Sequence, residues 1–102
     1  MVARVASFDG LNVEAARRTN GEGEAIIRPL ISTLEGFQSS LDLLSADGKV
    51  PSITIFGSEA NALAAEATFD EQIPQLPGDL FEDWVGHRVS VDHYEVLART
   101  DT

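Results

Sequence analysis

The two histidines of this chain, His87 and His93, lie in one stretch near its C-terminal end, HRVSVDHYEVLART. Imidazole titrates near neutral pH, so either residue could accept a proton from a substrate or bind a metal ion. The stretch alternates apolar and polar residues, which predicts a strand over residues 87–99. At about 3.3 Å per residue, the two histidines would lie roughly 20 Å apart on it. Within one subunit they therefore cannot bind one metal ion or share one proton.

Each histidine has to be considered alone. His87 follows Gly86 at the start of the predicted strand and is three residues from Trp84. It could act as a base or form a hydrogen bond with a substrate phenol; the alternative is a histidine that faces water at a strand start. His93 lies in the polar run Asp-His-Tyr-Glu and is interpreted as structural or solvent-exposed. His87 is therefore the predicted catalytic residue, and no metal site is predicted.

Aromatic residues could form the walls of a substrate-binding pocket for a flat molecule. The candidates are Phe56, Phe69, Phe81 and Trp84, together with Tyr94 as a hydrogen-bond donor. At strand and helix spacing, the same residues could be ordinary core side chains, and Tyr94 could simply pack on its strand. Trp84 is the strongest candidate among them, because its region is irregular and loops often carry function.

The elements that position these residues follow from periodicity and turn signals. Four strands and two helices are predicted, at residues 2–8, about 22–34, 37–46, 50–56, from 58 onward and 87–99. Asn12 is a candidate N-cap for the first helix, but the polar and glycine residues at 19–23 indicate either an interruption or a separate first turn. Pro29 is expected to kink this helix, and Asp47-Gly48 indicates a hairpin turn.

The second helix is predicted to begin after Ser58, with an apolar stripe formed by Ala60, Leu63, Ala64 and Ala67 and with Phe69 as a further candidate. Beyond it, prolines break any long helix, and the apolar residues around 80–85 suit one or two helical turns. The resulting order, β-α-β-β-α-β, is that of a ferredoxin-like α+β fold: a four-stranded antiparallel sheet with two helices on one face. The length of 102 residues predicts a single domain over 1–102.

Both faces of the predicted sheet carry apolar side chains. In the third strand, Ile53 and Ile55 point one way while Thr54 and Phe56 point the other. Two helices cover only one face, and a monomer would expose the other as a large apolar patch. We therefore expect a homodimer in which two sheets face each other. The alternative is that the strand registers are shifted by one residue and the second face is polar.

Composition excludes several functions. Seven basic residues against seventeen acidic ones give a formal charge of −10, which repels nucleic acid and anionic membrane surfaces. The absence of cysteine excludes disulfides, thiolate nucleophiles and zinc-thiolate sites. Neither a signal peptide nor a membrane-spanning apolar run is apparent, so a soluble, cytoplasmic protein is expected.

Four stretches carry a likeness to a known family: VARVASFDG, RPLISTLEGFQSSLDLLSADGKV, SITIFGSEANALAAEA and VSVDHYEVLA. Together they span most of the chain, and they resemble the antibiotic biosynthesis monooxygenase-like family of dimeric α+β barrels. The resemblance implies a homodimer whose two sheets form a barrel, with a pocket between sheet and helices in each subunit. It also implies oxidation of aromatic compounds by molecular oxygen, without metal or flavin.

The chain departs from the haem-degrading branch of that family. That branch uses an asparagine in its first strand, a tryptophan, and a histidine ligand from the second helical region. Here the first strand has Ser7 and Phe8 but no asparagine, and the predicted second helix has no histidine. Trp84 and His87 lie later in the chain and do not match that pattern, which disfavours haem degradation.

Two functions remain open at this point. The first is a cofactor-independent monooxygenase acting on a small aromatic, phenolic or quinone-like compound, with His87 as base and the aromatic candidates as pocket walls. The second is a non-catalytic dimer that binds a small apolar molecule or has a purely structural role. An open cavity with a buried polar group would favour the enzyme, and a filled barrel the alternative, because a fold alone does not determine function.

Overall fold

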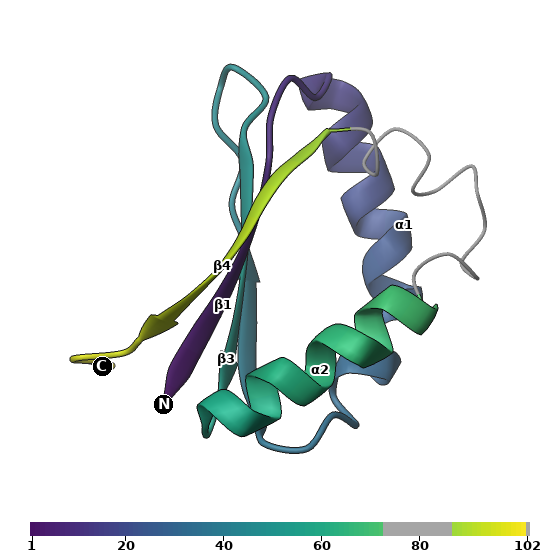
Figure 1. The fold of residues 1–102 in the computed structure, drawn as a ribbon. Coiled ribbons are helices and arrows are strands. Elements are labelled where there is room, and N and C mark those ends of the chain that lie inside the picture. Colours follow the sequence, from purple (N-terminus) through teal and green to yellow (C-terminus); the bar gives the residue numbers. More distant parts are fainter. Residues whose placement is uncertain (73–86, 102) are drawn as a thin grey trace.

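The computed structural model describes residues 1–72 and 87–101. The elements are β1 (Val2–Phe8), α1 (Val13–Ile31), β2 (Phe37–Asp42), β3 (Val50–Phe56), α2 (Glu59–Gln72) and β4 (Arg88–Glu95). The four strands form one antiparallel sheet in the order β2-β3-β1-β4. Both helices lie on the same side of this sheet (Figure 1). The predicted ferredoxin-like βαββαβ arrangement is therefore confirmed. No helix among the described residues is long and apolar enough to cross a membrane.

The register decides which residues of neighbouring strands share a face. Arg4 of β1 pairs with Thr54 of β3 on one side and with His93 of β4 on the other. Because directly paired residues point to the same side of a sheet, these three side chains share one face. Arg4 and Thr54 are buried, which identifies that face as the one under the helices.

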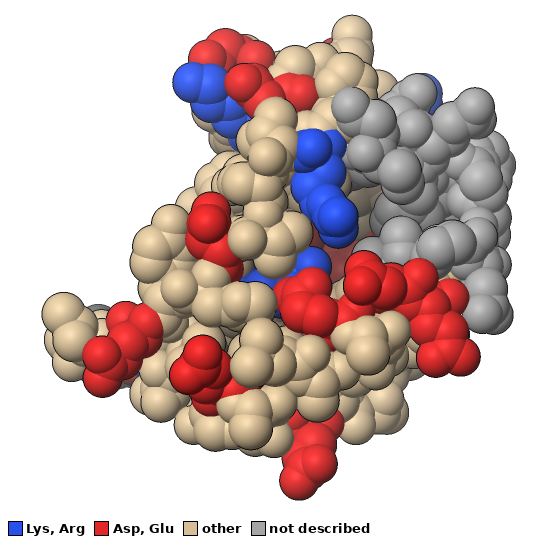
Figure 2. Space-filling model, viewed as in Figure 1, with Lys and Arg blue, Asp and Glu red and all other residues tan. Residues whose placement is uncertain are grey.

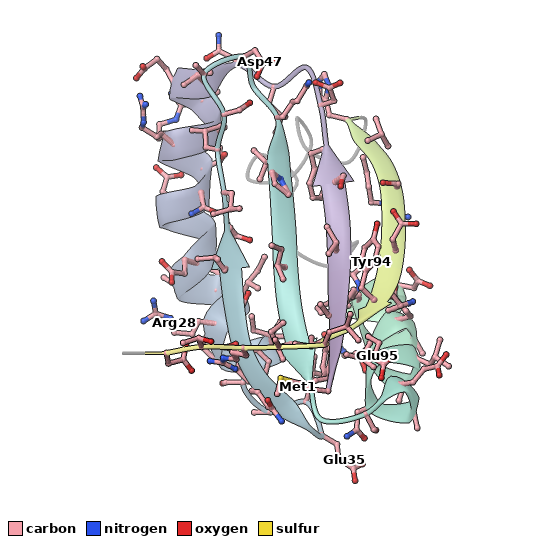
Figure 3. All side chains as sticks on the ribbon, turned by 90° about the vertical axis from the view of Figure 1, so that its left-hand side faces the viewer. Met1, Arg28, Glu35, Asp47, Tyr94 and Glu95 are labelled. Atoms are coloured by element: carbon pink, nitrogen blue, oxygen red, sulfur yellow. The ribbon has the colours of Figure 1, made fainter. Side chains whose placement is uncertain are left out.

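The opposite face of the sheet is open and apolar at its centre. Val5 pairs with Ile53, which in turn pairs with Leu41 of β2. Ala3 pairs with Ile55 on one side and with Tyr94 on the other. Figure 3 looks directly onto this face and shows the four strands side by side with no helix in front of them. Both sheet faces thus carry apolar residues, as the alternation in the third strand predicts.

The core lies between the sheet and the helices. One cluster joins the fully buried Phe56 of β3 to Ala62, Ala65 and Phe69 of α2. A second cluster joins Leu11, Ala16 and Val50, with Phe8 packed against it. Burial of such side chains contributes about 1.5–3 kcal/mol for each large residue, so these two clusters fix the helices on the sheet.

Helix α1 is longer than predicted and continues without interruption through residues 19–23. Its N-cap is Asn12, whose side chain accepts a hydrogen bond from the Ala15 N–H. Gly23 and Thr19 are buried, so packing against the rest of the fold outweighs the weak intrinsic helix propensity of this stretch. Pro29 lies in the last turn, and the helix ends two residues later at Ile31.

The buried face of helix α2 shares only Phe69 with the predicted apolar stripe. Its buried residues are Ala62, Ala65 and Phe69, whereas Leu63 is 54% exposed. Alanine occurs on every side of this helix, so the small residues do not distinguish one face from another. The large ring of Phe69 therefore decides the orientation of the helix. Ala65 and Ala62 lie one and two turns before it on the same face.

The strand boundaries differ modestly from prediction. β2 ends at Asp42 rather than at residue 46, and β4 ends at Glu95 rather than at residue 99. The predicted turn at Asp47-Gly48 is present, and Gly48 has a φ of 84°. The short helical segment predicted around residues 80–85 lies outside the described residues.

Candidate functional site

His87 is positioned immediately before β4, beside the end of β1. Its Nδ1 atom lies 2.9 Å from the carbonyl oxygen of Asp9. A backbone carbonyl only accepts hydrogen bonds, so Nδ1 must carry the proton and donate it. The neutral ring then has its free lone pair on Nε2. The same connection is reinforced in the backbone, where the Asp9 N–H donates to the His87 carbonyl over 2.9 Å.

His87 lines a cavity of about 240 Å³ at the N-terminal end of α1. The other described residues around it are Gly10, Leu11, Asn12, Ala15, Ala16 and Thr19. A cavity of about 150 Å³ is known to hold a benzene ring, so this one has room for a single-ring aromatic compound. Among the described residues, the cavity therefore combines a small space of mixed polar and apolar lining with one titratable group.

A second group of ionisable residues lies elsewhere on the helix-covered face. Arg4 of β1 forms a two-pronged ion pair with Glu66 of α2, in which Nε bonds Oε1 and Nη2 bonds Oε2 over 3.3 Å. His93 of β4 places its Nε2 atom 3.3 Å from the same Oε1 atom. The guanidinium carbon of Arg4 also lies 4.4 Å from the ring centre of Phe69. Three separate elements thus meet at one carboxylate.

Burial in this cluster is graded. The side chain of Arg4 is 7% exposed, whereas those of Glu66 and His93 are 24% and 26% exposed. A buried guanidinium requires a compensating anion, and Glu66 provides it. The cluster is therefore buried at Arg4 and more open at Glu66 and His93, whose side chains reach solvent.

The structure does not gather the sequence-predicted substrate-binding residues into one place. Phe56 is fully buried and Phe69 is 7% exposed, and both belong to the same core cluster. Tyr94 is 55% exposed on the open face of the sheet, away from the helices. Phe81 and Trp84 lie outside the described residues. His87 lines the cavity at the N-terminal end of α1, whereas Phe56 and Phe69 are part of the core.

Sequence reasoning missed Arg4 and Glu66 and assigned His93 to a structural or solvent-exposed role. A signal for Arg4 exists: it is the one charged residue in the otherwise uncharged strand sequence VARVASF. Its partners could not be found from spacing, because Glu66 is 62 positions away along the chain. The pairing of Arg4 with His93 depends on the register of two strands at opposite ends of the sequence.

The surface around this region is strongly charged. Figure 2 shows a hollow between β4 and α2, in which basic and acidic side chains lie next to each other, and acidic side chains continue along α2. The described part of the chain contains no group of three or more metal-ligating side chains suited to an ion. The cluster is thus an assembly of opposite charges rather than a set of oxygen ligands.

No protein-family description matches this chain, and comparison with curated proteins finds no match either. Solved structures do match. A provisionally named antibiotic biosynthesis monooxygenase from Bordetella bronchiseptica aligns with a TM-score of 0.64 at 15% identity, covering 95% of this chain and 97% of that one. The ActVA-Orf6 monooxygenase of Streptomyces coelicolor, in complex with nanaomycin D, aligns with a TM-score of 0.66 at 17% identity, covering 99% and 91%.

A protein of unknown function from Nitrosomonas europaea also aligns, with a TM-score of 0.61, 16% identity and coverage of 99% and 93%. At such identities the likeness concerns the arrangement of the backbone rather than the residues of a site. The three alignments nevertheless cover nearly all of both chains, so no large element of the fold is left unmatched. The chain thus has the fold of antibiotic biosynthesis monooxygenase structures, as its sequence resemblance implied.

Proposed function

We propose that this chain is a single-domain monooxygenase that acts, without a cofactor, on a small phenolic or quinone-like compound. The observation that carries the proposal is the state of His87, whose Nδ1 is committed to the Asp9 carbonyl while the ring borders a cavity large enough for one aromatic ring. A fold shared with structures named monooxygenases supports the same reaction class. The substrate, the base role of His87 and the lack of a cofactor are parts of the proposal.

The reaction begins with a proton transfer. The Nε2 lone pair of His87 accepts the proton of a phenolic O–H, and the electron pair stays on the oxygen. The resulting anion is electron-rich and reacts with molecular oxygen directly. One oxygen atom enters the substrate and the other leaves as water. The substrate supplies the two electrons and two protons that reduce the second atom, so that it loses four electrons in all (AH2 + O2 → AO + H2O). The substrate must therefore be easily oxidised once it is deprotonated, as hydroquinones are.

Oxygen uptake tests this proposal. Purified protein is supplied with a panel of phenols and hydroquinones, and uptake is compared with the spontaneous rate. General-base catalysis contributes about 100- to 10,000-fold, so a His87→Gln variant should lose at least about 100-fold in rate. Lys49→Gln, at the exposed hairpin, is the control and should keep the full rate. No uptake with any compound, or uptake that survives in His87→Gln, would contradict the proposal.

A non-catalytic role in small-molecule binding is the second candidate. It is favoured by the burial of Phe56 and Phe69 in the core, which leaves fewer aromatic walls around a substrate than the sequence predicted. Binding of a phenol at the His87 cavity without oxygen uptake, measured by calorimetry, would support this role instead.

We also propose that the protein is a homodimer formed through the open face of the sheet. The face is apolar at its centre, and each edge carries one exposed apolar residue, Leu41 (56% exposed) and Tyr94 (55% exposed), beside the polar residues Ser39 and Asp92. Beyond β4 the chain leaves the sheet toward this same side (Figure 1), and Leu97 on that segment is 89% exposed. A second copy of the chain would cover both features, because the two open faces are identical and self-complementary in polarity.

A further inference from the structure

Three dipeptides of the chain place an aspartate or an asparagine directly before a glycine: Asp9-Gly10, Asn20-Gly21 and Asp47-Gly48. In such a pair the glycine nitrogen can attack the carbonyl carbon of the preceding side chain, because glycine has no side chain of its own to hinder the approach. The product is a cyclic imide, a succinimide, which water reopens either to aspartate or to isoaspartate. The fold gives the three pairs different surroundings, and these decide which pair reacts first.

The Asn20-Gly21 pair is held in an unreactive geometry. Both residues lie inside helix α1, which runs without interruption from Val13 to Ile31. A helical N–H points along the axis to the carbonyl four residues earlier, and not to the side chain of the preceding residue. The Gly21 nitrogen therefore cannot reach the Asn20 side chain while the helix is formed.

The Asp47-Gly48 pair is protected by hydrogen bonds and charge. The Ser45 hydroxyl donates to the Asp47 carboxylate, and the Lys49 Nζ lies 3.7 Å from it. The Ser45 hydroxyl, the backbone and Lys49 together lower the pKa of Asp47 and keep its carboxyl group ionised, in which form the carbon is a poor electrophile. The Gly48 N–H, in turn, donates to the Ser45 carbonyl over 3.2 Å and is directed away from the carboxyl group.

The Asp9-Gly10 pair has neither form of protection. Both residues are exposed, and they lie between the end of β1 and the start of α1. The Gly10 N–H donates to Oδ1 of Asp9 over 2.8 Å, so the attacking nitrogen is already in contact with the carboxyl group that it attacks. Rotation of that group about its Cβ–Cγ bond presents Cγ to the nitrogen. No lysine or arginine in residues 1–72 and 87–101 forms an ion pair with this carboxylate.

The chain is anchored on both sides of this pair and has room at its centre. Before it, the Asp9 N–H donates to the His87 carbonyl over 2.9 Å. After it, the Leu11 N–H donates to the Gly48 carbonyl over 3.1 Å. Among the described residues, a β-carbon at Gly10 would meet only ring atoms of His87, at 3.5 and 3.8 Å. The main chain can therefore lengthen at Gly10 without a clash against other backbone.

We propose that Asp9-Gly10 is a site of spontaneous isoaspartate formation, and that this modification gives His87 a carboxylate as its hydrogen-bond acceptor. In the first step the Gly10 nitrogen bonds to Cγ of the protonated Asp9 side chain, its proton passes to the departing hydroxyl group, and water leaves. In the second step water adds to the main-chain carbonyl carbon of Asp9, and the bond from this carbon to the Gly10 nitrogen breaks. The electron pair of that bond stays on the nitrogen, so the net change is an isomerisation with no oxidant or reductant.

The isomerised link runs through Cβ and Cγ of Asp9, and the former main-chain carbonyl becomes a free carboxylate. That carbonyl oxygen is the atom that lies 2.9 Å from Nδ1 of His87. The hydrogen bond from the Asp9 N–H to the His87 carbonyl lies on the unaltered side of the new link and keeps the two residues together. The Nδ1–H then faces a charged acceptor, and hydrogen bonds to ionised groups are roughly twice as strong as neutral ones. Any effect on proton transfer at Nε2 rests on the function proposed for His87, whereas the modification itself does not.

Ageing of the purified full-length chain tests the site. The protein is stored in mildly acidic buffer, where part of the carboxyl groups is protonated, and is then digested. Isoaspartate is labelled by an isoaspartyl methyltransferase and located by mass spectrometry of the peptides. Label should accumulate at Asp9-Gly10 before it appears at Asp47-Gly48. Asp9→Glu should lose it, because the longer side chain closes a larger ring much more slowly.

Two further variants keep the test specific. Asp9→Asn should form isoaspartate faster than the wild-type protein, because an amide passes through the same succinimide and is not ionised. Asp47→Glu makes the matched change at the hairpin and should leave the label at Asp9-Gly10 unaltered. Label that appears first at Asp47-Gly48, label that persists at this position in Asp9→Glu, or no label at Asp9-Gly10 overturns the proposed site.

Nitrogen NMR of the His87 ring tests the second part of the proposal. The Nδ1 signal should move in the aged wild-type protein in proportion to the isoaspartate content, and it should stay in place in Asp9→Glu stored in the same way. An unchanged His87 signal in a sample that contains isoaspartate at Asp9 overturns the assignment of the carboxylate to His87. Oxygen uptake enters neither measurement, so failure of the monooxygenase proposal and failure of this one are distinguishable.

Discussion

Arg4 shows how one residue connects stability to the chemistry of the interior. Its side chain is 7% exposed, pairs with Glu66 and stacks on Phe69. Removing one partner of a buried ion pair leaves the other charge without compensation. Arg4→Leu should therefore destabilise the protein by about 3 kcal/mol. Urea unfolding followed by circular dichroism measures this loss.

The matching double variant tests the reason for the loss. Replacing a whole buried ion pair by apolar residues is often close to neutral. Arg4→Leu combined with Glu66→Leu should therefore recover most of the stability that Arg4→Leu alone loses. If the double variant is as unstable as the single one, the contribution of Arg4 comes from packing on Phe69 and not from its charge.

The same residue marks the limit of what the sequence predicts about the site. His87 was identified because a histidine beside a strand start is visible in the sequence, and the structure places it at a cavity. The Arg4 cluster was not identified, because it exists only after β1 pairs with β4 and α2 packs across them. Proximity of residues that are distant in sequence depends on register and packing, which periodicity alone does not supply.

At the scale of elements, two glycines of this fold, Gly21 and Gly48, have opposite roles. Gly21 lies in the exposed part of α1, and a β-carbon there would meet nothing within 4 Å. Gly48 has a φ of 84°, and a β-carbon there would lie 2.1 Å from the carbonyl oxygen of Leu11. Gly21→Ala should stabilise the protein by about 0.5–1 kcal/mol through helix propensity.

Gly48→Ala should do the opposite. It combines an unfavourable positive φ with a backbone clash, so a loss well above about 1 kcal/mol is expected. The clash would also disturb the hydrogen bond between the Leu11 N–H and the Gly48 carbonyl, which connects the hairpin to the segment before α1. Thermal unfolding of both variants and the wild-type protein checks that Gly21→Ala raises the stability and Gly48→Ala lowers it. Similar effects of the two substitutions would contradict this account.

Within residues 1–72 and 87–101, the β2–β3 hairpin contains the one group, Asp47, whose pKa is clearly displaced. The Ser45 hydroxyl donates to Asp47, and with the backbone N–H of Asp47 and the charge of Lys49 it lowers the pKa of that carboxyl below its ordinary value. A lowered folded-state pKa contributes stability above the unfolded-state pKa, and this contribution is lost as pH falls through the folded-state pKa.

Ser45→Ala should move the pKa of Asp47 back toward its ordinary value, since the hydroxyl is the largest cause of the shift. Carboxyl NMR titration of Asp47 in the two proteins measures this directly. Asp47 is fully exposed, so the accompanying change in stability should be small and should shrink further in salt. An unchanged pKa in Ser45→Ala would assign the shift to the backbone and Lys49 instead.

The elements themselves were largely predictable, and the faces of the helices were not. Alternation along β3 and the Asp47-Gly48 turn identified the hairpin because strand and turn signals are local. Helix α2 was located but rotated, because alanines on all sides make its period uninformative until Phe69 is placed in the core. The uninterrupted α1 reflects tertiary packing that outweighs two glycines.

For the whole molecule, the open apolar face and the net charge of −10 act in opposite directions on association. Burial of the face favours a dimer, whereas two copies carry a combined charge of about −20 and repel each other. Salt screens this repulsion over a Debye length of about 10 Å at 0.1 M. The proposed dimer should therefore become tighter as ionic strength rises, which sedimentation or light scattering at increasing salt concentration measures.

Two exposed leucines provide a matched test of which surface carries the contact. Leu41 lies on the open face of the sheet and is 56% exposed, and Leu63 lies on the outer side of α2 and is 54% exposed. Neither is needed for the core, so Leu41→Lys and Leu63→Lys should both fold. Leu41→Lys should shift the protein to a monomer, because a cation would be buried between two sheets, while Leu63→Lys should leave the dimer intact. A dimer lost in Leu63→Lys but kept in Leu41→Lys would move the contact to the helices.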